Sequence, residues 1–333
     1  MMPDPPALPR GGDRTERNPT VTHALSRFFR RAASRRGRLG ALAAAGLLAT
    51  TVASTVATPW AGAARAAGTG EAASPGAAPA PGTLRICASN VEAPFSEKDG
   101  SGFEDRIAEV LATAMGRKAV FVRTDQAGIY LVRDLLDKNA CDVVMGVDVG
   151  DPRVLVSRPY YRTGYVMVTR ADRNITTTRW DDPQIQAMSR FALRFYSPAE
   201  TIVKRLGRFE DNAAYMYSLV NFKSRRNQWV QVPGDRLVSE VAGGEAEVGL
   251  AFAPEVARYV RTSPTPLRMT VISNDLDQGE GRPTIPLHYD QAIGVRQGDT
   301  ALMAEINAAL ETARPQIEAI LAGEGIPLLK PNS

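Results

Sequence analysis

The sequence predicts an α/β protein with two lobes and a cleft between them. In residues 83–147, apolar strands alternate with helical patterns in the order strand, helix, strand, helix, strand. This order is typical of βαβ units with a largely parallel sheet, where ligands gather at the carboxyl ends of the strands. A second region opens at Ala171 with strands and helices of its own, and a strand and a long helix follow it at residues 292–322. We expect this last pair to return to the first lobe.

In the first region, strands are expected at residues 83–89, 119–123 and 142–147, because these short runs are apolar and rich in β-branched side chains. Helices are expected at residues 104–115 and 130–136, where apolar side chains recur at helical spacing. Together these elements form the expected βαβαβ half.

Later elements follow from the same patterns. Strands are expected at residues 164–169, 248–252 and 292–295, and helices at residues 198–206, 254–260 and 302–322, the last with a break at Pro315. The first lobe is therefore predicted to comprise residues 83–169 and 291–330, and the second lobe residues 170–290. Two crossings, near residues 168–171 and 290–294, would form the hinge.

Residues 1–66 have the layout of an export signal. A basic run from Arg27 to Arg38 precedes the uncharged stretch at residues 39–57, and Ala64-Arg65-Ala66 resembles a cleavage site. The rival interpretation is an uncleaved membrane anchor, but Ala, Gly, Thr and Ser dilute this stretch. We expect cleavage and a periplasmic location, with residues 67–82 as a disordered Ala/Gly/Pro-rich tether.

The basic character of the whole chain belongs to this leader. The formal charge of the chain is +4, but residues 1–66 hold ten Arg against three acidic residues. Residues 67–333 hold 30 basic and 33 acidic residues, a net charge of −3. The body of the protein therefore has no general attraction to nucleic acid.

Two cysteines, Cys87 and Cys141, lie in or just before predicted strands. An exported chain meets an oxidising compartment, which favours a disulfide between them, and the alternative is two buried thiols. The only histidines are His23 and His288, so the chain lacks the ligands that a zinc site requires. We expect no metal and no cofactor.

Short motifs in the first region carry a family resemblance. They are APF at residues 93–95, GFE at 102–104, CDVV at 141–144 and SRPYY at 157–161. In this order they resemble the type II extracellular solute-binding proteins of the amino-acid receptor kind, and the resemblance covers residues 84–329. It implies the bilobal periplasmic binding protein type II fold, with mixed central sheets joined by a two-stranded hinge, and a function in binding rather than catalysis.

A narrower resemblance rests on longer motifs. They are KDGSGFE at residues 98–104, IYLVRD at 129–134, GDPRVL at 150–155, SPAE at 197–200, SLVNF at 218–222 and ARPQIEAIL at 313–321. These are similar to the J-protein family of methanol oxidation systems (MxaJ/XoxJ). The resemblance implies a periplasmic accessory protein whose partner is the pyrroloquinoline quinone (PQQ)-dependent methanol dehydrogenase, with a role in its assembly or activation.

The resemblance also implies a cleft that holds a ligand or a partner. We predict that it is lined by Asn90, Glu92, Phe95, Asp148, Arg153, Tyr160, Ser197, Phe252 and Asp290. In the amino-acid receptors an arginine binds the ligand carboxylate and an aspartate of the second lobe binds its ammonium group. Arg153 matches the arginine, whereas Phe252 takes the place of the aspartate, and a desolvated amine requires a carboxylate. We therefore expect a protein segment, a carboxylate or no small ligand in this cleft.

Several of these residues have a second interpretation. Arg153 either clamps a ligand or pairs with Asp148 or Asp151 in its own turn. Tyr160 either lines the cleft or packs in the hinge. Phe95 either stacks on a ligand or covers the core.

A basic run at residues 221–228 (NFKSRRNQ) is a candidate partner surface. Its members, with the tryptophan that follows, are Phe222, Lys223, Arg225, Arg226 and Trp229. Arg and Trp are frequent at interface hot spots, but most charge runs are simply solvated.

Two other functional classes remain as alternatives. A receptor for a small carboxylate or amino-acid-like solute, serving an ABC transporter, would share the fold. An enzyme would need catalytic groups, but the chain has no nucleophile elbow, phosphate-binding glycine loop or zinc signature. Glu92 is the nearest candidate for lyase chemistry, and we do not expect an enzyme.

Overall fold

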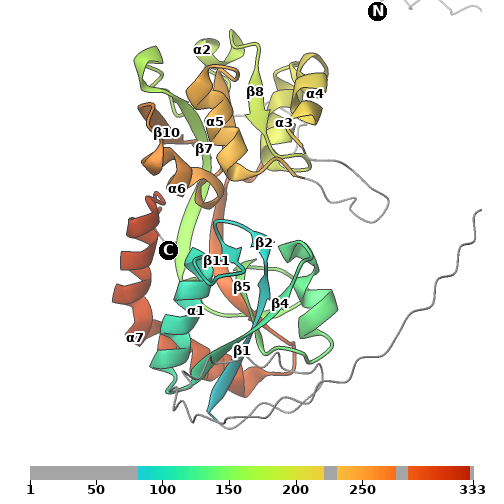
Figure 1. Cartoon of the computed structure of the whole chain (residues 1–333), viewed down its shortest axis with the longest axis vertical. Helices are drawn as coiled ribbons and strands as arrows, with labels where there is room; N and C mark the ends of the chain where they lie inside the picture. Colours follow the sequence, from blue (N-terminus) through green and yellow to red (C-terminus); the bar gives the residue numbers. More distant parts are fainter. Residues whose placement is uncertain (1–81, 221–230, 275–283, 331–333) are drawn as a thin grey trace, which may run out of the picture. The chain divides into compact units, whose positions relative to one another are not determined.

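The computed structural model describes residues 82–220, 231–274 and 284–330 (Figure 1). Within these residues, one nine-stranded sheet has the order β4-β1-β5-β11-β7-β9-β8, with β10 paired to β7 and β6 (Leu155–Val156) paired to β11. Buried hydrophobic residues divide the sheet into two parts. Two clusters pack around β1 and β5, and a third packs around β7, β8 and β9. None of the helices in these residues is long and apolar enough to cross a bilayer.

The first part of the sheet contains parallel strands. β1 (Thr83–Ser89) lies between β4 (Lys118–Thr124) and β5 (Val143–Asp148), and both neighbours run parallel to it. The helices α1 (Phe103–Ala114) and α7 (Thr300–Glu324) lie side by side and bury apolar residues in its core (Figure 1). Because β1 and β5 are parallel, their carboxyl ends open at the same edge, beside the hairpin of β2 (Val91–Glu92) and β3 (Ser96–Glu97).

The second part is built around β7. Its strands are β7 (Tyr161–Arg170), β8 (Phe191–Leu193), β9 (Val248–Phe252) and β10 (Leu267–Val271). Its helices are α2 (Pro183–Gln186), α3 (Pro198–Arg205), α4 (Phe209–Ser218), α5 (Gly234–Gly243) and α6 (Ala253–Thr262). The carboxyl ends of the parallel strands β8 and β9 therefore meet at one edge as well.

Two long strands connect the parts (Figure 1). β7 pairs with β11 (His288–Val295) through Tyr161–Gly164, and with β9 from Tyr165 onward. β11 in turn pairs with β5 from Gln291 onward. From Tyr165 onward, side chains of β7 pack in the hydrophobic cluster of the second part of the sheet. This cluster therefore begins five residues before residue 170, where the second lobe was predicted to begin.

Two elements differ from the sequence prediction. Residues 130–136 do not form an α-helix, because a 3-10 turn at Gly128–Tyr130 leads into a π-helical turn at Val132–Leu136. This wider turn places Leu131, Val132 and Leu136 in a small cluster with Cys87 and Cys141. The helix α7 is not broken at Pro315. Pro315 is exposed, so water can satisfy the carbonyl that loses its hydrogen bond there.

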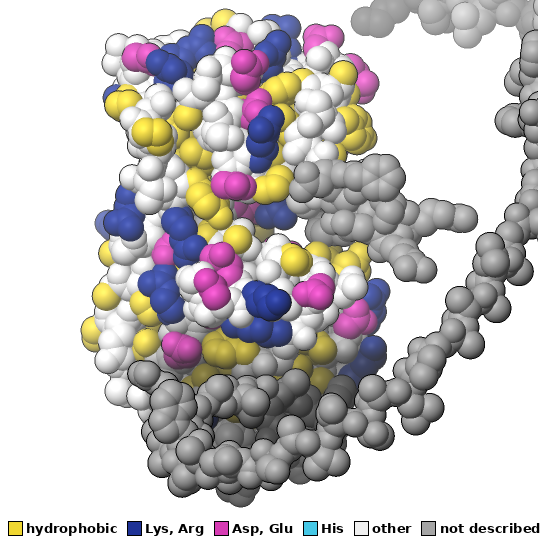
Figure 2. All heavy atoms as spheres, viewed as in Figure 1, with side chains coloured by type: hydrophobic (Ala, Val, Ile, Leu, Met, Phe, Trp, Pro, Cys, Tyr) yellow, Lys and Arg dark blue, Asp and Glu magenta, His cyan; other side chains and the backbone are white. Residues whose placement is uncertain are grey.

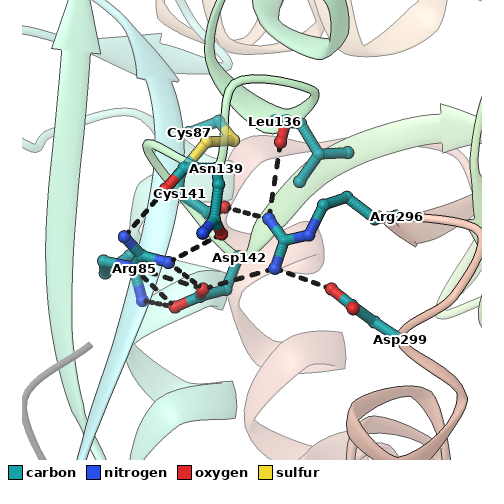
Figure 3. Close-up of a disulfide and its surroundings, with 8 residues drawn as sticks. All are labelled: Arg85, Cys87, Leu136, Asn139, Cys141, Asp142, Arg296 and Asp299. Carbon is teal, nitrogen blue, oxygen red and sulfur yellow. Dashed lines mark hydrogen bonds and ion pairs between the residues drawn. A yellow bond between two sulfur atoms is a disulfide. The ribbon is translucent and has the colours of Figure 1, made fainter. Parts of the chain in front are cut away.

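A disulfide joins Cys87 of β1 to Cys141, two residues before β5 (Figure 3). Beside it, Arg85 and Asp142 form a buried ion pair of 2.7 Å, and Asp142 also accepts a hydrogen bond from the backbone N–H of Arg85. Arg296 donates to the carbonyl oxygen of Cys141 at 2.6 Å and pairs with Asp299. Buried charges require such partners. The group fixes β1, β5 and the end of β11 to one another.

Candidate functional site

Two adjoining cavities, each of about 270 Å³, form the candidate site. The first lies at the carboxyl ends of β1 and β5, and the second lies where β8 and β9 end. Glu92, Gly128 and Ile129 line both cavities. The second cavity therefore brings residues of the first part together with Tyr165, Arg194, Phe195, Tyr196, Ser197, Pro198, Gln231 and Glu255.

The β2–β3 hairpin places Glu92 and Phe95 at the first cavity. One carboxylate oxygen of Glu92 accepts a hydrogen bond from the backbone N–H of Gly128 at 2.8 Å, which ties the hairpin to the next loop. The ring of Phe95 lies 5.2 Å from the ring of Phe103 in the core, measured between centroids. Phe95 thus covers the core with one side and lines the cavity with the other.

Arg153 is held by its own turn. Its guanidinium binds both carboxylate oxygens of Asp151, with the shortest contact at 2.6 Å, and its backbone N–H donates to Asp151 at 2.9 Å. These hydrogen bonds hold the pKa of Asp151 below its usual value, although partial burial opposes them. The sequence left open whether Arg153 clamps a ligand or pairs within its own turn. The geometry matches the second interpretation, because the guanidinium already binds Asp151.

Below the first cavity, Tyr160 holds a buried carboxyl group. The Tyr160 hydroxyl donates to Glu104 at 3.0 Å and accepts from the backbone N–H of Gly146 at 3.0 Å. Gly146 has a φ of +65°. This backbone conformation favours glycine, and a Cβ there would also lie 2.5 Å from a carboxylate oxygen of Glu104, which would have to move. Tyr160 was predicted to line the cleft, but it is buried and lines neither cavity; instead it supports Glu104, which lines the first one.

The environment of Glu104 favours its neutral form. Burial raises the pKa of Glu104 to about 7, the charges of Asp105 and Glu92 act in the same direction, and the hydrogen bond from Tyr160 opposes them. Sequence reasoning missed Glu104 as a cavity residue. The signal was its place in the GFE motif, at the first turn of α1 beside the ends of the parallel strands.

Asp148 follows directly from the rule that parallel strands present ligands at their carboxyl ends, since it is the last residue of β5. It lines the first cavity and accepts a hydrogen bond of 2.5 Å from the side-chain amide of Gln291. Loss of water raises its pKa, the hydrogen bond from Gln291 lowers it, and the nearby charge of Asp151 raises it again.

Asn90 and Asp290 lie outside both cavities. The Asn90 side chain donates to Asp125 at 2.8 Å, and Asp290 lies 3.7 Å from the Nε of Arg162 in the paired strands β7 and β11. Both residues were placed in the cleft by the sequence analysis. The structure instead gives each a partner within the scaffold.

On the second side, Ser197 lines the cavity while its hydroxyl donates to the carbonyl oxygen of Arg194 at 2.7 Å. Arg194 and Glu255 form an ion pair of 2.5 Å across the ends of β8 and β9. Phe252 lies beside the cavity wall rather than in it, since its ring packs 5.7 Å from the ring of Tyr165, which does line the cavity.

Arg194 and Glu255 were not predicted. Arg194 directly follows β8, and Glu255 lies in the first turn of the helix that follows β9, so the strand-end rule that identified Asp148 also applied to them. The predicted partner surface of Phe222, Lys223, Arg225, Arg226 and Trp229 lies outside the described residues. Within the described part of the chain, no three His, Cys, Asp or Glu residues form a group suited to a metal ion.

Comparisons with known proteins agree with this architecture. Residues 84–320 match the family of bacterial extracellular solute-binding proteins, family 3. Protein MoxJ of Methylorubrum extorquens is 56% identical over 248 residues, which cover 74% of this chain and 82% of that protein. Protein MoxJ of Paracoccus denitrificans is 49% identical over 246 residues, which cover 74% of this chain and 89% of that protein.

A solved structure indicates the same family. The crystal structure of MxaJ from Methlophaga aminisulfidivorans MPT matches with a TM-score of 0.70 and 44% identity, covering 74% of this chain and all of that one. The periplasmic binding protein fold and the binding-protein class predicted from the sequence are thereby confirmed. The chain belongs to the family 3 bacterial extracellular solute-binding proteins and, among them, to the family of the MoxJ and MxaJ proteins.

Proposed function

We propose that this chain is a periplasmic accessory binding protein of a PQQ-dependent methanol oxidation system. It binds the methanol dehydrogenase and assists the assembly or activation of that enzyme. The observation that carries the proposal is the 56% identity to MoxJ over most of both chains. The chain is exported by its leader, and its two lobes, residues 83–169 with 291–330 and residues 170–290, flank the cleft that meets the partner.

The chemistry of the cleft supports a protein partner over a free amino acid. The two arginines that line the cavities, Arg153 and Arg194, already bind Asp151 and Glu255. A free amino acid brings a carboxylate that needs a cation in a desolvated site. A residue within a protein chain has no such carboxylate, so it avoids this cost.

In the mechanism we propose, the accessory protein binds one conformation of the dehydrogenase more tightly than the others. Only such a difference in affinity shifts the population toward the state competent for cofactor or metal loading. The predicted surface of Phe222, Lys223, Arg225, Arg226 and Trp229 would add contacts to an acidic region of the partner.

The test is binding of the purified periplasmic protein to apo and holo dehydrogenase, measured by biolayer interferometry. We expect saturable binding with different affinities for the two forms. Absence of binding to both would contradict the proposal.

The small-solute receptor predicts a different result in a thermal-shift series with amino acids and small carboxylates. A true solute at about one hundred times its Kd would stabilise the folded protein by about 2.7 kcal/mol. We expect no such shift from any of them.

A further inference from the structure

Large hydrophobic side chains are exposed mainly around the cleft. Among the described residues six such side chains are exposed, and two of them, Ile129 and Tyr196, line a cavity. Val91 and Val149 are chain neighbours of the lining residues Glu92 and Asp148, and the ring of Tyr217 stacks on the lining residue Phe195 with centroids 4.9 Å apart. Tyr196 is 71% exposed and Ile129 is 45% exposed, and they line the same cavity from opposite sides. Figure 2 shows hydrophobic, acidic and basic side chains close together along the hollow in the middle of the described face. Exposed apolar groups gathered at one place are typical of a docking surface.

The charge inside the cleft is negative. Six carboxyl groups line the cavities, those of Glu92, Glu104, Asp105, Asp148, Asp151 and Glu255, against the two guanidinium groups of Arg153 and Arg194. Asp105 pairs with Arg123 at 3.2 Å, and burial favours the neutral form of Glu104, so neither adds to the unbalanced negative charge. Both lining arginines are neutralised by ion pairs with lining carboxylates. Within the described residues, Glu92 and Asp148 form no ion pair with Lys or Arg, although they line one cavity.

These observations define the chemistry of the occupant. A basic side chain would complement Glu92 and Asp148, and an adjacent apolar or aromatic side chain would cover Ile129 and Tyr196. Complementary charge selects the partner, and buried aromatic contacts supply most of the affinity. A free basic amino acid fits less well, since its own carboxylate would meet this negative lining.

We propose that the cleft docks a segment of a protein partner in which an arginine or lysine stands next to an apolar or aromatic residue, with the basic group directed at Glu92 and Asp148. This inference rests on the proposed function, because the partner is the dehydrogenase.

The test uses the double variant Glu92→Gln/Asp148→Asn. Each amide keeps an oxygen that can accept the hydrogen bond from Gly128 or Gln291, so the fold is retained while two charges are lost. The matched control is Glu318→Gln, an exposed carboxyl on α7 outside both cavities. Binding of the dehydrogenase to the double variant should weaken roughly tenfold or more, since each tenfold corresponds to about 1.4 kcal/mol and close charge pairs reach that size. The control should bind as the wild type does.

A second arm uses defined probes. The first is a capped tripeptide with arginine between tyrosine and leucine, and the second replaces arginine with citrulline, which has the same shape without the charge. Fluorescence anisotropy should show binding of the arginine peptide to the wild type, and weaker binding both of the citrulline peptide and to the double variant. Free arginine should compete poorly.

The outcomes separate the two proposals. If the wild type binds the dehydrogenase and the double variant binds it equally well, the basic-segment inference is wrong while the proposed function stands. If neither binds the dehydrogenase, the proposed function fails. The peptide arm then decides the charge preference of the cleft, and equal affinity for the arginine and citrulline peptides would overturn it.

Discussion

Reduction of the Cys87–Cys141 disulfide is expected to lower the free energy of unfolding by about 4 kcal/mol. The bond closes a loop of 54 residues, and the chain-entropy relation for a loop of that length gives this value. Both cysteines are buried, so the reduced thiols also remain in a packed cluster with Leu131, Val132 and Leu136. Urea unfolding followed by circular dichroism, with and without reductant, measures the difference.

The double variant Cys87→Ala/Cys141→Ala is the control for this result. It should unfold at a lower urea concentration than the oxidised wild type, and reductant should leave its transition unchanged. A reduced wild type that unfolds at the same urea concentration as the oxidised protein would show that the bond contributes nothing.

The buried carboxyl of Glu104 should make the protein less stable as the pH rises from about 4.5 to about 7. Its folded pKa of about 7 lies above the ordinary value of 4.5, so the unfolded chain loses this proton first. The native state therefore binds more protons than the unfolded state in this window, and the free energy of unfolding falls. The difference between the two pKa values corresponds to a contribution of about 3 kcal/mol to the free energy of unfolding. This contribution is present below pH 4.5 and is lost as the pH rises above 7.

The comparison that isolates this effect is between the wild type and Glu104→Gln. The amide oxygen can still accept the hydrogen bond from Tyr160, but the side chain no longer titrates. We expect the stability of the wild type to fall relative to this variant across the window, whereas Glu109→Gln, an exposed position on the same helix, should follow the wild type. Parallel pH curves for the wild type and Glu104→Gln would contradict the pKa of about 7.

Local patterns in the sequence were sufficient to predict much of the fold. The strand at residues 83–89 and the strand at residues 248–252 have the predicted bounds. Short apolar runs with β-branched residues, bounded by polar segments, favour the strand conformation. Pairing between distant segments is not visible locally. The strand expected at residues 164–169 extends from Tyr161 to Arg170, since its first residues pair with β11, more than 120 residues later in the chain.

The candidate site was only partly predictable for the same reason. Glu92, Phe95, Asp148, Arg153 and Ser197 were found because they follow strands or occupy known motif positions, and all of them line a cavity. The partner of each side chain depends on three-dimensional contacts. The sequence left open whether Arg153 binds a ligand or Asp151, and it gave no sign that Arg194 and Glu255 would pair across two strand ends.

Docking of the dehydrogenase in the cleft is tested most directly by site-specific photo-crosslinking. A photoreactive phenylalanine analogue is placed at Tyr196 in the cleft and, as a control, at Leu328, which is 45% exposed and lines neither cavity. Crosslinking in the periplasm of cells that produce the dehydrogenase should attach it at position 196 and not at position 328. Attachment only at position 328, or no dehydrogenase attached at position 196, would contradict docking in the cleft.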